Sequence, residues 1–248
     1  MQTIDYNELA NISYMTKGSF ARIYECEYNG KKYILKEYKD DDYLKNKKKK
    51  LNMLSKNVKH EQLILPIYFV NQNKNTNMLL MNYSPLNPLY LFKESSINKK
   101  IKMLKQAKEV IKIMHDEKII HSDLHSGNIL VDDKSFDINI IDFEGSSYKG
   151  SNILLKDTNE IAREFLKKYG TSEELDTFIF NITTFDLLNA TGFYSVRGEI
   201  NKKNYGVLNN NKDAIKICNT FFLEDDVPNK DYLIDTIDES ILKRLLRR

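Results

Sequence analysis

The sequence contains few of the residues that mark disulfide-bonded or zinc-binding proteins. Its 248 residues include no Trp, two Cys, four His, four Pro and nine Gly. Cys26 and Cys218 are far apart and belong to no CxxC or Cys/His cluster. These absences argue against a structural zinc site and a disulfide framework, so we expect a reducing, cytoplasmic environment.

The sequence also lacks a marked charge imbalance and a long apolar run. Its 38 basic and 35 acidic side chains leave a net charge of +3, which gives no general argument for nucleic acid or membranes as partners, and we expect no nucleic acid. Docking of the apolar tail residues on the helical part is expected, with membrane contact through Lys243, Arg244, Arg247 and Arg248 as the alternative. No run reaches the roughly eighteen apolar residues of a membrane-spanning helix. The first residues, MQTIDYNELANISY, are acidic and polar where a signal peptide needs basic and then apolar residues. Hydrophobic residues make up 41% of the chain, which is enough for a buried core.

Residues 1–82 have the pattern of a β-sheet with one helix. The strand-like runs are SFARIYECEY, KKYILKEY, LILPIYFV and NMLLMNY. Asn29-Gly30 joins the first two runs, and this pair is the strongest short signal for a hairpin because both turn residues need positive φ. A helix is expected over 41–60, with the lysines at 47–50 on its solvated side.

Residues 83–248 have a different pattern, in which helices predominate. The proline-containing SPLNPLYLF is expected to connect the two parts. A long helix is expected over 97–117, and shorter ones at about 158–168, at 173–189 and in the tail at 239–248. The sequence therefore predicts an α+β fold, with a small β-rich lobe (1–82) and a larger helical lobe (83–248) that together form one domain.

Two motifs in the β-rich lobe carry groups suited to binding phosphate. A turn of small residues follows Lys17, and such a turn lets backbone N–H groups approach phosphate oxygens closely. Lys36 follows 18 residues after Gly18, in the strand-like YILK. The two-residue period of a strand puts Ile34 and Lys36 on one face, so an apolar contact lies beside a cation. Either motif alone is also found in ordinary hairpins and at solvated strand edges.

Two motifs in the helical lobe carry carboxylates and an amide. IIHSDLHSGNIL contains Asp123, which can accept a proton from an attacking hydroxyl, and Asn128, whose amide oxygen can bind Mg²⁺. Asp142 follows the apolar residues of IIDFE, 19 positions after Asp123. A carboxylate fixed at the end of a strand is a hard oxygen ligand for an Mg²⁺ ion that bridges nucleotide phosphates.

The order of these motifs, from the glycine-containing hairpin through the strand lysine to HxDLxxxN and Asp-Phe, resembles the protein-kinase-like superfamily. The resemblance implies a bilobal fold, ATP and Mg²⁺ as cofactors, and transfer of the γ-phosphate to a hydroxyl. It implies that Lys36 binds the α and β phosphates, Asp123 is the catalytic base, and Asn128 and Asp142 bind the metal. The residues that it places around ATP are Gly18, Ser19, Phe20, Ala21, Ile23, Ile34, Lys36, Met81, Asn82, Ser84 and Leu130.

Several positions depart from the family pattern. Thr16 and Ala21 stand where the first and third glycines of the phosphate loop usually are. Ser122 replaces an Arg that pairs with a phosphorylated loop, and His125 stands where Ser/Thr kinases usually have Lys. His121 matches a histidine that is structural in the family. Metal binding by His121 and His125 is the rival hypothesis, although no third ligand is suitably spaced.

Two further departures bear on catalysis. Glu144 replaces the Gly of Asp-Phe-Gly, and IDFEGSSYKG is similar to the corresponding segment of choline and ethanolamine kinases. It is expected either to reach a second metal ion or to be a solvated or helix-capping residue. Lys50 stands where the family has the Glu that pairs with the strand lysine. The acids considered as replacements are Asp41, Asp42 and Glu61, and the alternative is a nucleotide-binding pseudokinase.

The segment after Asp142 helps to distinguish a protein acceptor from a small-molecule acceptor. It can be aligned with known kinases in two ways. In one, Asp157 begins the next helix directly, as in aminoglycoside- and choline-kinase-like enzymes. In the other, Asp176 is buried under the catalytic loop, as in protein kinases. The β-rich lobe and the catalytic loop favour Ser or Thr of a protein as acceptor, with a small-molecule hydroxyl as the alternative. The acidic residues between 224 and 239 are expected to attract a basic acceptor or to form a solvated loop.

Overall fold

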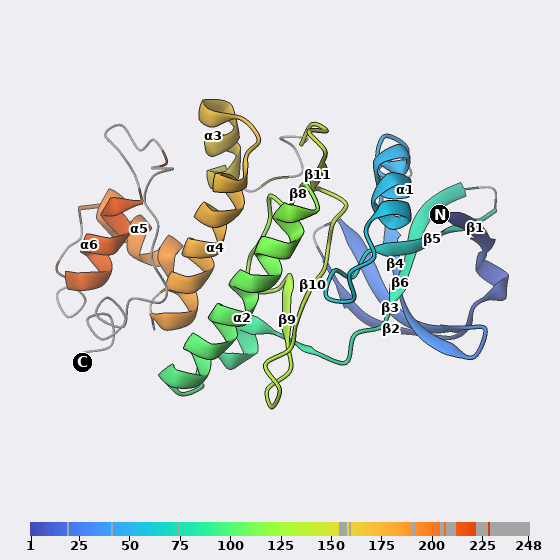
Figure 1. The fold of residues 1–248 in the computed structure, drawn as a ribbon, viewed down its shortest axis with the longest axis horizontal. Helices are drawn as coiled ribbons and strands as arrows, with labels where there is room; N and C mark the ends of the chain where they lie inside the picture. Colours follow the sequence, from blue (N-terminus) through green and yellow to red (C-terminus); the bar gives the residue numbers. More distant parts are fainter. Residues whose placement is uncertain are drawn as a thin grey trace. The chain divides into compact units, whose positions relative to one another are not determined.

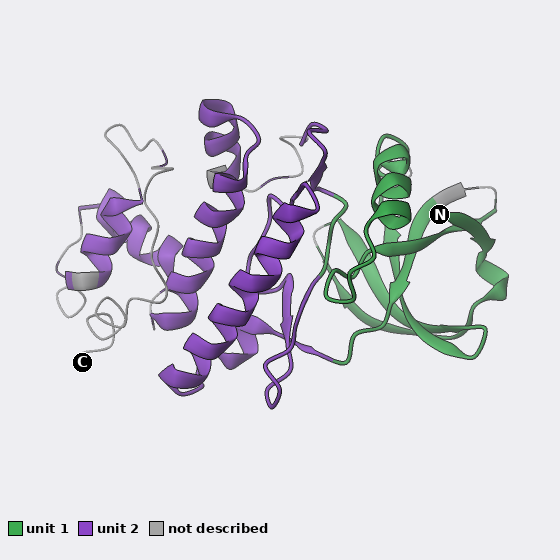
Figure 2. Cartoon of the chain, viewed as in Figure 1, with its two compact units in different colours: residues 1–85, 141–144 green, residues 86–140, 145–248 purple. Residues whose placement is uncertain are grey.

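The chain forms two compact units in the computed structural model (Figure 2). The structure describes residues 1–18, 20–40, 42–73, 75–153, 158, 160–189, 192–203, 206, 212–221 and 228. Unit 1 comprises Met1–Pro85 together with Ile141–Glu144, and unit 2 comprises Leu86–Ile140 together with Gly145–Arg248. The α+β fold class is confirmed, since one six-stranded sheet dominates unit 1 and helices dominate unit 2.

The sheet of unit 1 has the strand order β1-β5-β6-β4-β3-β2. All neighbouring strands pair antiparallel except β1 and β5, which are parallel. The predicted hairpin between β3 and β4 is confirmed, because Asn29 and Gly30 have φ angles of 49° and 71°. The strands are β1 (Gln2–Asp5), β2 (Ala10–Lys17), β3 (Ala21–Tyr28), β4 (Lys31–Tyr38), β5 (Pro66–Gln72) and β6 (Asn75–Asn82).

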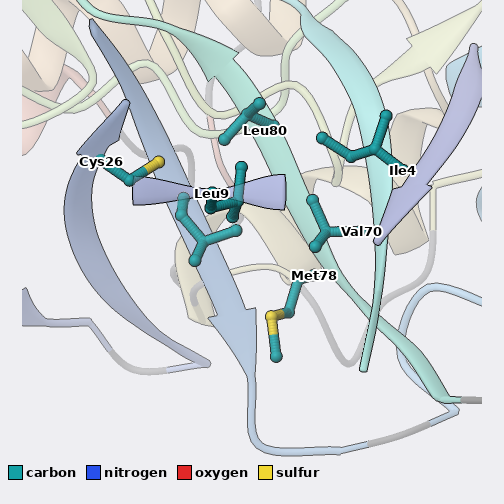
Figure 3. Packing of buried hydrophobic residues seen from close by; sticks show 7 residues of the cluster. Ile4, Leu9, Cys26, Val70, Met78 and Leu80 are labelled. Carbon is teal, nitrogen blue, oxygen red and sulfur yellow. The ribbon is translucent and has the colours of Figure 1, made fainter. Parts of the chain in front are cut away.

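One face of this sheet carries an apolar cluster. Cys26 of β3, Leu35 of β4 and Leu80 of β6 are buried there, and tyrosines of the sheet pack around them. Because side chains alternate along a strand, residues 23, 34 and 36 lie on the opposite face. The sheet therefore carries this apolar cluster on one face and Lys36 on the other. The cluster, most of which is labelled in Figure 3, consists of Ile4, Leu9, Cys26, Leu35, Val70, Met78 and Leu80.

The helix of unit 1 is shorter than predicted. Helix α1 spans Lys48–Asn57, and turns occupy residues 42–47 before it. The expectation that the lysines at 47–50 are all solvated is wrong for three of them. Lys48 is half-buried. Lys47 is buried, with its ammonium 3.4 Å from the centroid of the Tyr43 ring. Lys50 is half-buried and makes a hydrogen bond described below.

Unit 2 is built around helix α2 (Ile97–Asp116), which packs against helix α4 (Glu173–Leu188) (Figure 1). The predicted helices at 97–117 and 173–189 are thus confirmed. Among the described residues no helix is long and apolar enough to cross a membrane. The other elements are β7 (Asn87–Pro88), η2 (Leu89–Phe92), β8 (Ile119–Ile120), β9 (Ile129–Val131), β10 (Ile138–Ile140), β11 (Ser147–Tyr148), α3 (Glu160–Tyr169), α5 (Phe193–Asn201) and α6 (Lys212–Thr220).

Short strand pairs in unit 2 hold the loop at 121–128. Strand β8 precedes the loop and pairs with β11, whereas β9 follows it and pairs with both β10 and β7. The loop is therefore fixed at both ends by backbone hydrogen bonds. The predicted tail helix at 239–248 and the acidic residues between 224 and 239 lie outside the described residues.

Candidate active site

Lys36 lies in the middle of the sheet of unit 1. It is opposite Ile23 of β3 on one side and Leu79 of β6 on the other, while Ile34 is opposite Met81. Directly opposed residues of antiparallel strands share a face. The structure therefore brings three of the predicted adenine contacts, Ile23, Ile34 and Met81, onto the same face as Lys36.

The ammonium of Lys36 contacts two carboxylates. Its Nζ lies 2.7 Å from Oδ1 of Asp142 and 3.0 Å from Oε1 of Glu144. Burial of Lys36 acts to lower its pKa, but the two neighbouring carboxylates more than compensate, so the pKa is raised above its ordinary value. Lys36 is therefore a permanent cation in this site.

Glu144 is almost completely buried, with 1% of its surface exposed. Its Oε1 also accepts a hydrogen bond of 2.5 Å from the hydroxyl of Tyr38. Burial raises the pKa of the Glu144 carboxyl, and the charge of Lys36 opposes that effect. The expectation of a solvated glutamate is therefore wrong. Burial likewise raises the pKa of Tyr38 well above its ordinary value, so Tyr38 acts as a hydrogen-bond donor.

Of the acids proposed as partners of Lys36, the two that the structure describes, Asp42 and Glu61, do not contact it. Asp42 is exposed and pairs with Lys45 at 3.6 Å, Glu61 is exposed, and Asp41 lies outside the described residues. Lys50, which stands at the family's glutamate position, donates to the backbone oxygen of Glu144 at 3.0 Å. Sequence reasoning singled out Glu144 as a departure but missed it as the partner of Lys36.

Asp142 has a backbone conformation that is uncommon outside glycine. Its φ is 73°, in the left-handed region, which Asp tolerates better than most residues. Its side chain is 43% exposed, in contrast to that of Glu144. Asp142 can thus reach a bound ligand while it contacts Lys36.

The predicted phosphate loop is the turn between β2 and β3. Gly18 donates its N–H to the backbone oxygen of Ala21 at 2.8 Å, and Ser19 lies outside the described residues. Gly18 does not have a positive φ, and a Cβ at this position would be 3.5 Å from the same oxygen, an ordinary contact. The backbone of this turn therefore does not require glycine at 18.

An aromatic stack links this turn to the Lys36 site. The ring of Phe20 stacks on Tyr43 with centroids 5.7 Å apart, and Tyr43 stacks on Tyr38 at 4.6 Å. The hydroxyl of Tyr38 in turn contacts Glu144. Phe20, one of the predicted ATP contacts, is half-exposed at the end of this stack.

Asp176 of helix α4 holds the loop at 121–128 in unit 2 through hydrogen bonds to its backbone. The fully buried Asp176 carboxylate accepts backbone hydrogen bonds from His121 and Ser122, both at 2.7 Å. It also lies 3.0 Å from Nε2 of His115. This arrangement agrees with the alignment that buries Asp176 under the loop. Asp157, on which the other alignment depends, lies outside the described residues.

Asp123 and Asn128 are joined within the same loop. The Asn128 amide nitrogen donates to the backbone oxygen of Asp123 at 2.9 Å and to its Oδ2 at 3.3 Å. Both hydrogen bonds come from nitrogen, so the amide oxygen is the atom that Asn128 can offer to a cation. Asp123 has a side chain that is 37% exposed, so its carboxylate is accessible.

The two histidines of the loop have different partners. The Nδ1 atom of buried His121 lies 3.3 Å from the backbone N–H of Asp123, which fits the predicted structural role. His125 folds back over Gly127, whose N–H donates to its Nδ1 at 3.0 Å. In a neutral ring the proton then resides on Nε2, which lies 3.6 Å from Oδ2 of Asp123.

A cavity of unit 2 lies beside His125. Asp186 of α4 and Tyr194 of α5 also line it. Burial raises the pKa of the Asp186 carboxyl, whose Oδ1 accepts a hydrogen bond from the backbone of Phe193 at 2.5 Å. The remaining lining residues are Ser126, Ile179, Ile182 and Thr183.

The other predicted ATP contacts lie at the end of β6 and in β9. Asn82, the last residue of β6, is exposed and paired with Tyr33, and Ser84 is half-buried in the segment that follows. Leu130 is buried in β9, opposite Pro88 of β7. Asn82 and Ser84 belong to unit 1, and Leu130 belongs to unit 2.

The two predicted metal ligands each carry a hard oxygen donor. Asp142 of unit 1 offers a carboxylate oxygen and Asn128 of unit 2 offers an amide oxygen, and Mg²⁺ accepts both kinds of ligand. Within the described part of the chain, no group of three or more His, Cys, Asp or Glu side chains could hold a metal by itself.

Comparison with known proteins bears on the same residues. No curated protein matches the chain. The family model of the protein kinase domain matches residues 9–247, a range that includes the hairpin, Lys36, the loop with Asp123 and Asn128, and Asp142. The chain belongs to the protein kinase domain family.

Proposed function

We propose that this kinase transfers the γ-phosphoryl group of ATP to a Ser or Thr hydroxyl of a protein. The observation that carries the proposal is the 2.7 Å contact between Lys36 and the partly exposed Asp142. It pairs a permanent cation with a hard oxygen ligand, and phosphoryl transfer depends mainly on such positioned charges.

Each residue has a distinct task in this proposal. Lys36 binds the α and β phosphates, and Asn128 and Asp142 hold Mg²⁺. When bound, Mg²⁺ neutralises the negative charge of the polyphosphate. Asp123 orients the acceptor hydroxyl and takes its proton, for which its accessible carboxylate is suited. Asn128 donates to Asp123 and thereby holds the carboxylate in place.

The adenine ring is proposed to lie against the apolar residues on the Lys36 face. Ile23 and Ile34 form one side, and Met81 stands at the gatekeeper position. The backbone groups of Asn82 and Ser84 bind the edge of the ring, and Leu130 contributes from unit 2. The turn at 18–21 covers the phosphates with its backbone N–H groups.

A protein acceptor is supported by the loop at 121–128. Asp176 fixes this loop as in the protein-kinase alignment, and a cavity adjoins His125, whose Nε2 lies 3.6 Å from Oδ2 of Asp123. The Asp-Phe-Glu sequence at 142–144 instead favours a small-molecule acceptor, as in choline kinase-like enzymes. A small-molecule phosphotransferase is therefore the second candidate.

The two acceptor classes can be separated by measuring ADP formation from Mg-ATP. We expect turnover with a mixture of Ser- and Thr-containing peptides or a basic protein, and none with aminoglycosides, choline or sugars. Asp142→Asn should abolish turnover, whereas Asp133→Asn, an exposed acid outside the site, should retain it. Turnover with small molecules alone would favour the second candidate. Turnover of Asp142→Asn at the parental rate would contradict the site.

A further inference from the structure

Helix α1 has no acid with which to hold Lys36. Its sequence, KKKLNMLSKN, contains no Asp or Glu. The carboxylate next to Lys36 comes instead from Glu144, which is 108 positions later in the chain and 3.0 Å away. The ion pair that the family makes with a helix is thus made here with the segment that carries Asp142.

Glu144 is held in this contact from several directions. Its Oε1 accepts hydrogen bonds from Lys36 and Tyr38, both on β4. Its backbone oxygen accepts a third from Lys50 of α1. A buried carboxylate is unfavourable unless it is paired and hydrogen-bonded. Lys36 and Tyr38 meet that condition at Oε1, whereas the buried Oε2 has no hydrogen-bond donor among the described residues. The contacts at Oε1 and at the backbone oxygen keep Glu144 beside Lys36.

The local backbone places both acids on one ammonium. The left-handed conformation of Asp142 turns the chain directly after β10. As a result, Oδ1 of Asp142 and Oε1 of Glu144, from residues two positions apart, both lie within 3.0 Å of the Lys36 nitrogen. The conformation is uncommon for a non-glycine residue, and such outliers cluster at functional sites.

The two acids differ in what else they can bind. Asp142 has a side chain that is 43% exposed, whereas that of Glu144 is 1% exposed. A ligand can therefore reach the Asp142 carboxylate, while Glu144 is already committed to Lys36 and Tyr38. This difference indicates that Glu144 holds the Lys36 ammonium in place and is not a ligand of a second metal ion.

We infer that Glu144 is the positioning residue for Lys36 and replaces the helix glutamate used elsewhere in the family. The inference rests on the proposed function, because positioning matters when Lys36 binds the phosphates of ATP. One segment, 142–144, then supplies both the lysine partner and the exposed carboxylate. Helix α1 supplies no acid to this ion pair, and its contact with the segment is the hydrogen bond from Lys50 to the backbone oxygen of Glu144.

The inference is tested with variants that remove the carboxylate at position 144 and introduce one on helix α1. Glu144→Gly restores the family's residue and removes the carboxylate, and Glu144→Gln keeps the oxygen but removes the charge. Lys50→Glu combined with Glu144→Gly recreates the arrangement of the family. Lys49→Glu combined with Glu144→Gly is the matched control, because Lys49 is exposed on the same helix.

Binding of a fluorescent ATP analogue without Mg²⁺ is the primary readout, and KM for ATP and kcat are measured separately. We expect Glu144→Gly to weaken nucleotide binding by about tenfold, which corresponds to 1.4 kcal/mol. The nucleotide affinity of Glu144→Gln should lie between that of Glu144→Gly and that of the parent. The Lys50→Glu double variant should recover most of the affinity, and the Lys49→Glu double variant should not. Thermal melting shows which variants fold.

Several outcomes would overturn the inference. Parental nucleotide affinity in both Glu144→Gly and Glu144→Gln would show that Glu144 does not position Lys36. Equal recovery by the Lys49 and Lys50 double variants would show that only net charge matters. If Glu144→Gly fails to fold, Glu144→Gln decides, and the Lys50→Glu and Lys49→Glu comparison is made in the Glu144→Gln background. A parent that binds nucleotide but transfers no phosphate would contradict the proposed function alone, since the affinity comparison remains valid.

Discussion

Asp176 accepts a hydrogen bond of 2.7 Å from the backbone of Ser122, a residue whose φ is 68°. A left-handed conformation in a non-glycine residue costs on the order of 1 to 3 kcal/mol and persists only where surrounding contacts stabilise it. The same carboxylate accepts the N–H of His121. Asp176 thus fixes the backbone immediately before Asp123.

Replacing Asp176 should destabilise unit 2. Asp176→Ala leaves two buried backbone N–H groups without their acceptor, so we expect a loss of about 3 to 5 kcal/mol in the free energy of unfolding. Glu173→Gln on the same helix is the control, because Glu173 is 57% exposed, and it should change stability by less than about 0.5 kcal/mol. Denaturant unfolding measures both. A loss of less than about 1 kcal/mol in Asp176→Ala would contradict this role for the carboxylate.

Gly127 should control the position of His125. A Cβ at position 127 would lie 2.8 Å from Cε1 of His125, too close for both atoms to stay in place. The His125 ring is half-exposed and can move, so we expect Gly127→Ala to lower turnover with little change in melting temperature. His125→Ala should lower turnover as well, and adding Gly127→Ala to it should have no further effect. Additive losses in the double variant would show that Gly127 acts through another contact.

The two buried thiols should make stability fall at alkaline pH. Burial raises the pKa of Cys26 to about 11 and that of Cys218 to about 12. A thiol in the unfolded chain titrates near pH 8.5, so the unfolded state loses these protons first as pH rises. Their stabilising contribution is therefore complete below about pH 8.5 and is lost progressively as pH rises towards 11 and 12.

Urea unfolding at pH 8 and pH 10 measures this effect. The parent should lose about 1 to 2 kcal/mol more per thiol over that interval than the Cys26→Ala/Cys218→Ala variant. The double variant is the necessary comparison because tyrosines and lysines also titrate in this range. Identical losses in the two proteins would contradict the raised thiol pKa values.

Features fixed by local sequence were predictable. Asn29-Gly30 specified its hairpin because the two-residue turn requires positive φ at both positions. Alternation along β4 placed Ile34 and Lys36 on one face. The apolar spacing of 97–117 and 173–189 predicted helices α2 and α4 closely. In each case the physical cause lies in residues that are neighbours in the sequence.

Features that depend on distant contacts were not predictable. Glu144 meets Lys36 only because the segment at 141–144 packs against the sheet of unit 1, a contact that no local pattern encodes. The polar N-terminal residues gave no strong strand signal, yet β1 forms a parallel pair with β5, more than 60 residues later. The helix expected to begin at 41 begins at Lys48, after turns in which Lys47 covers the ring of Tyr43.

Intact-mass spectrometry shows whether Asp123-dependent phosphoryl transfer reaches a protein hydroxyl. The purified chain is incubated with Mg-ATP beside Asp123→Asn, which preserves the shape of the side chain but removes its basicity. Phosphate increments should appear on the parent and be absent from Asp123→Asn. Equal increments on both proteins would contradict the role of Asp123. No increment on either, while ATP is consumed once aminoglycosides, choline or sugars are added, would contradict the protein acceptor.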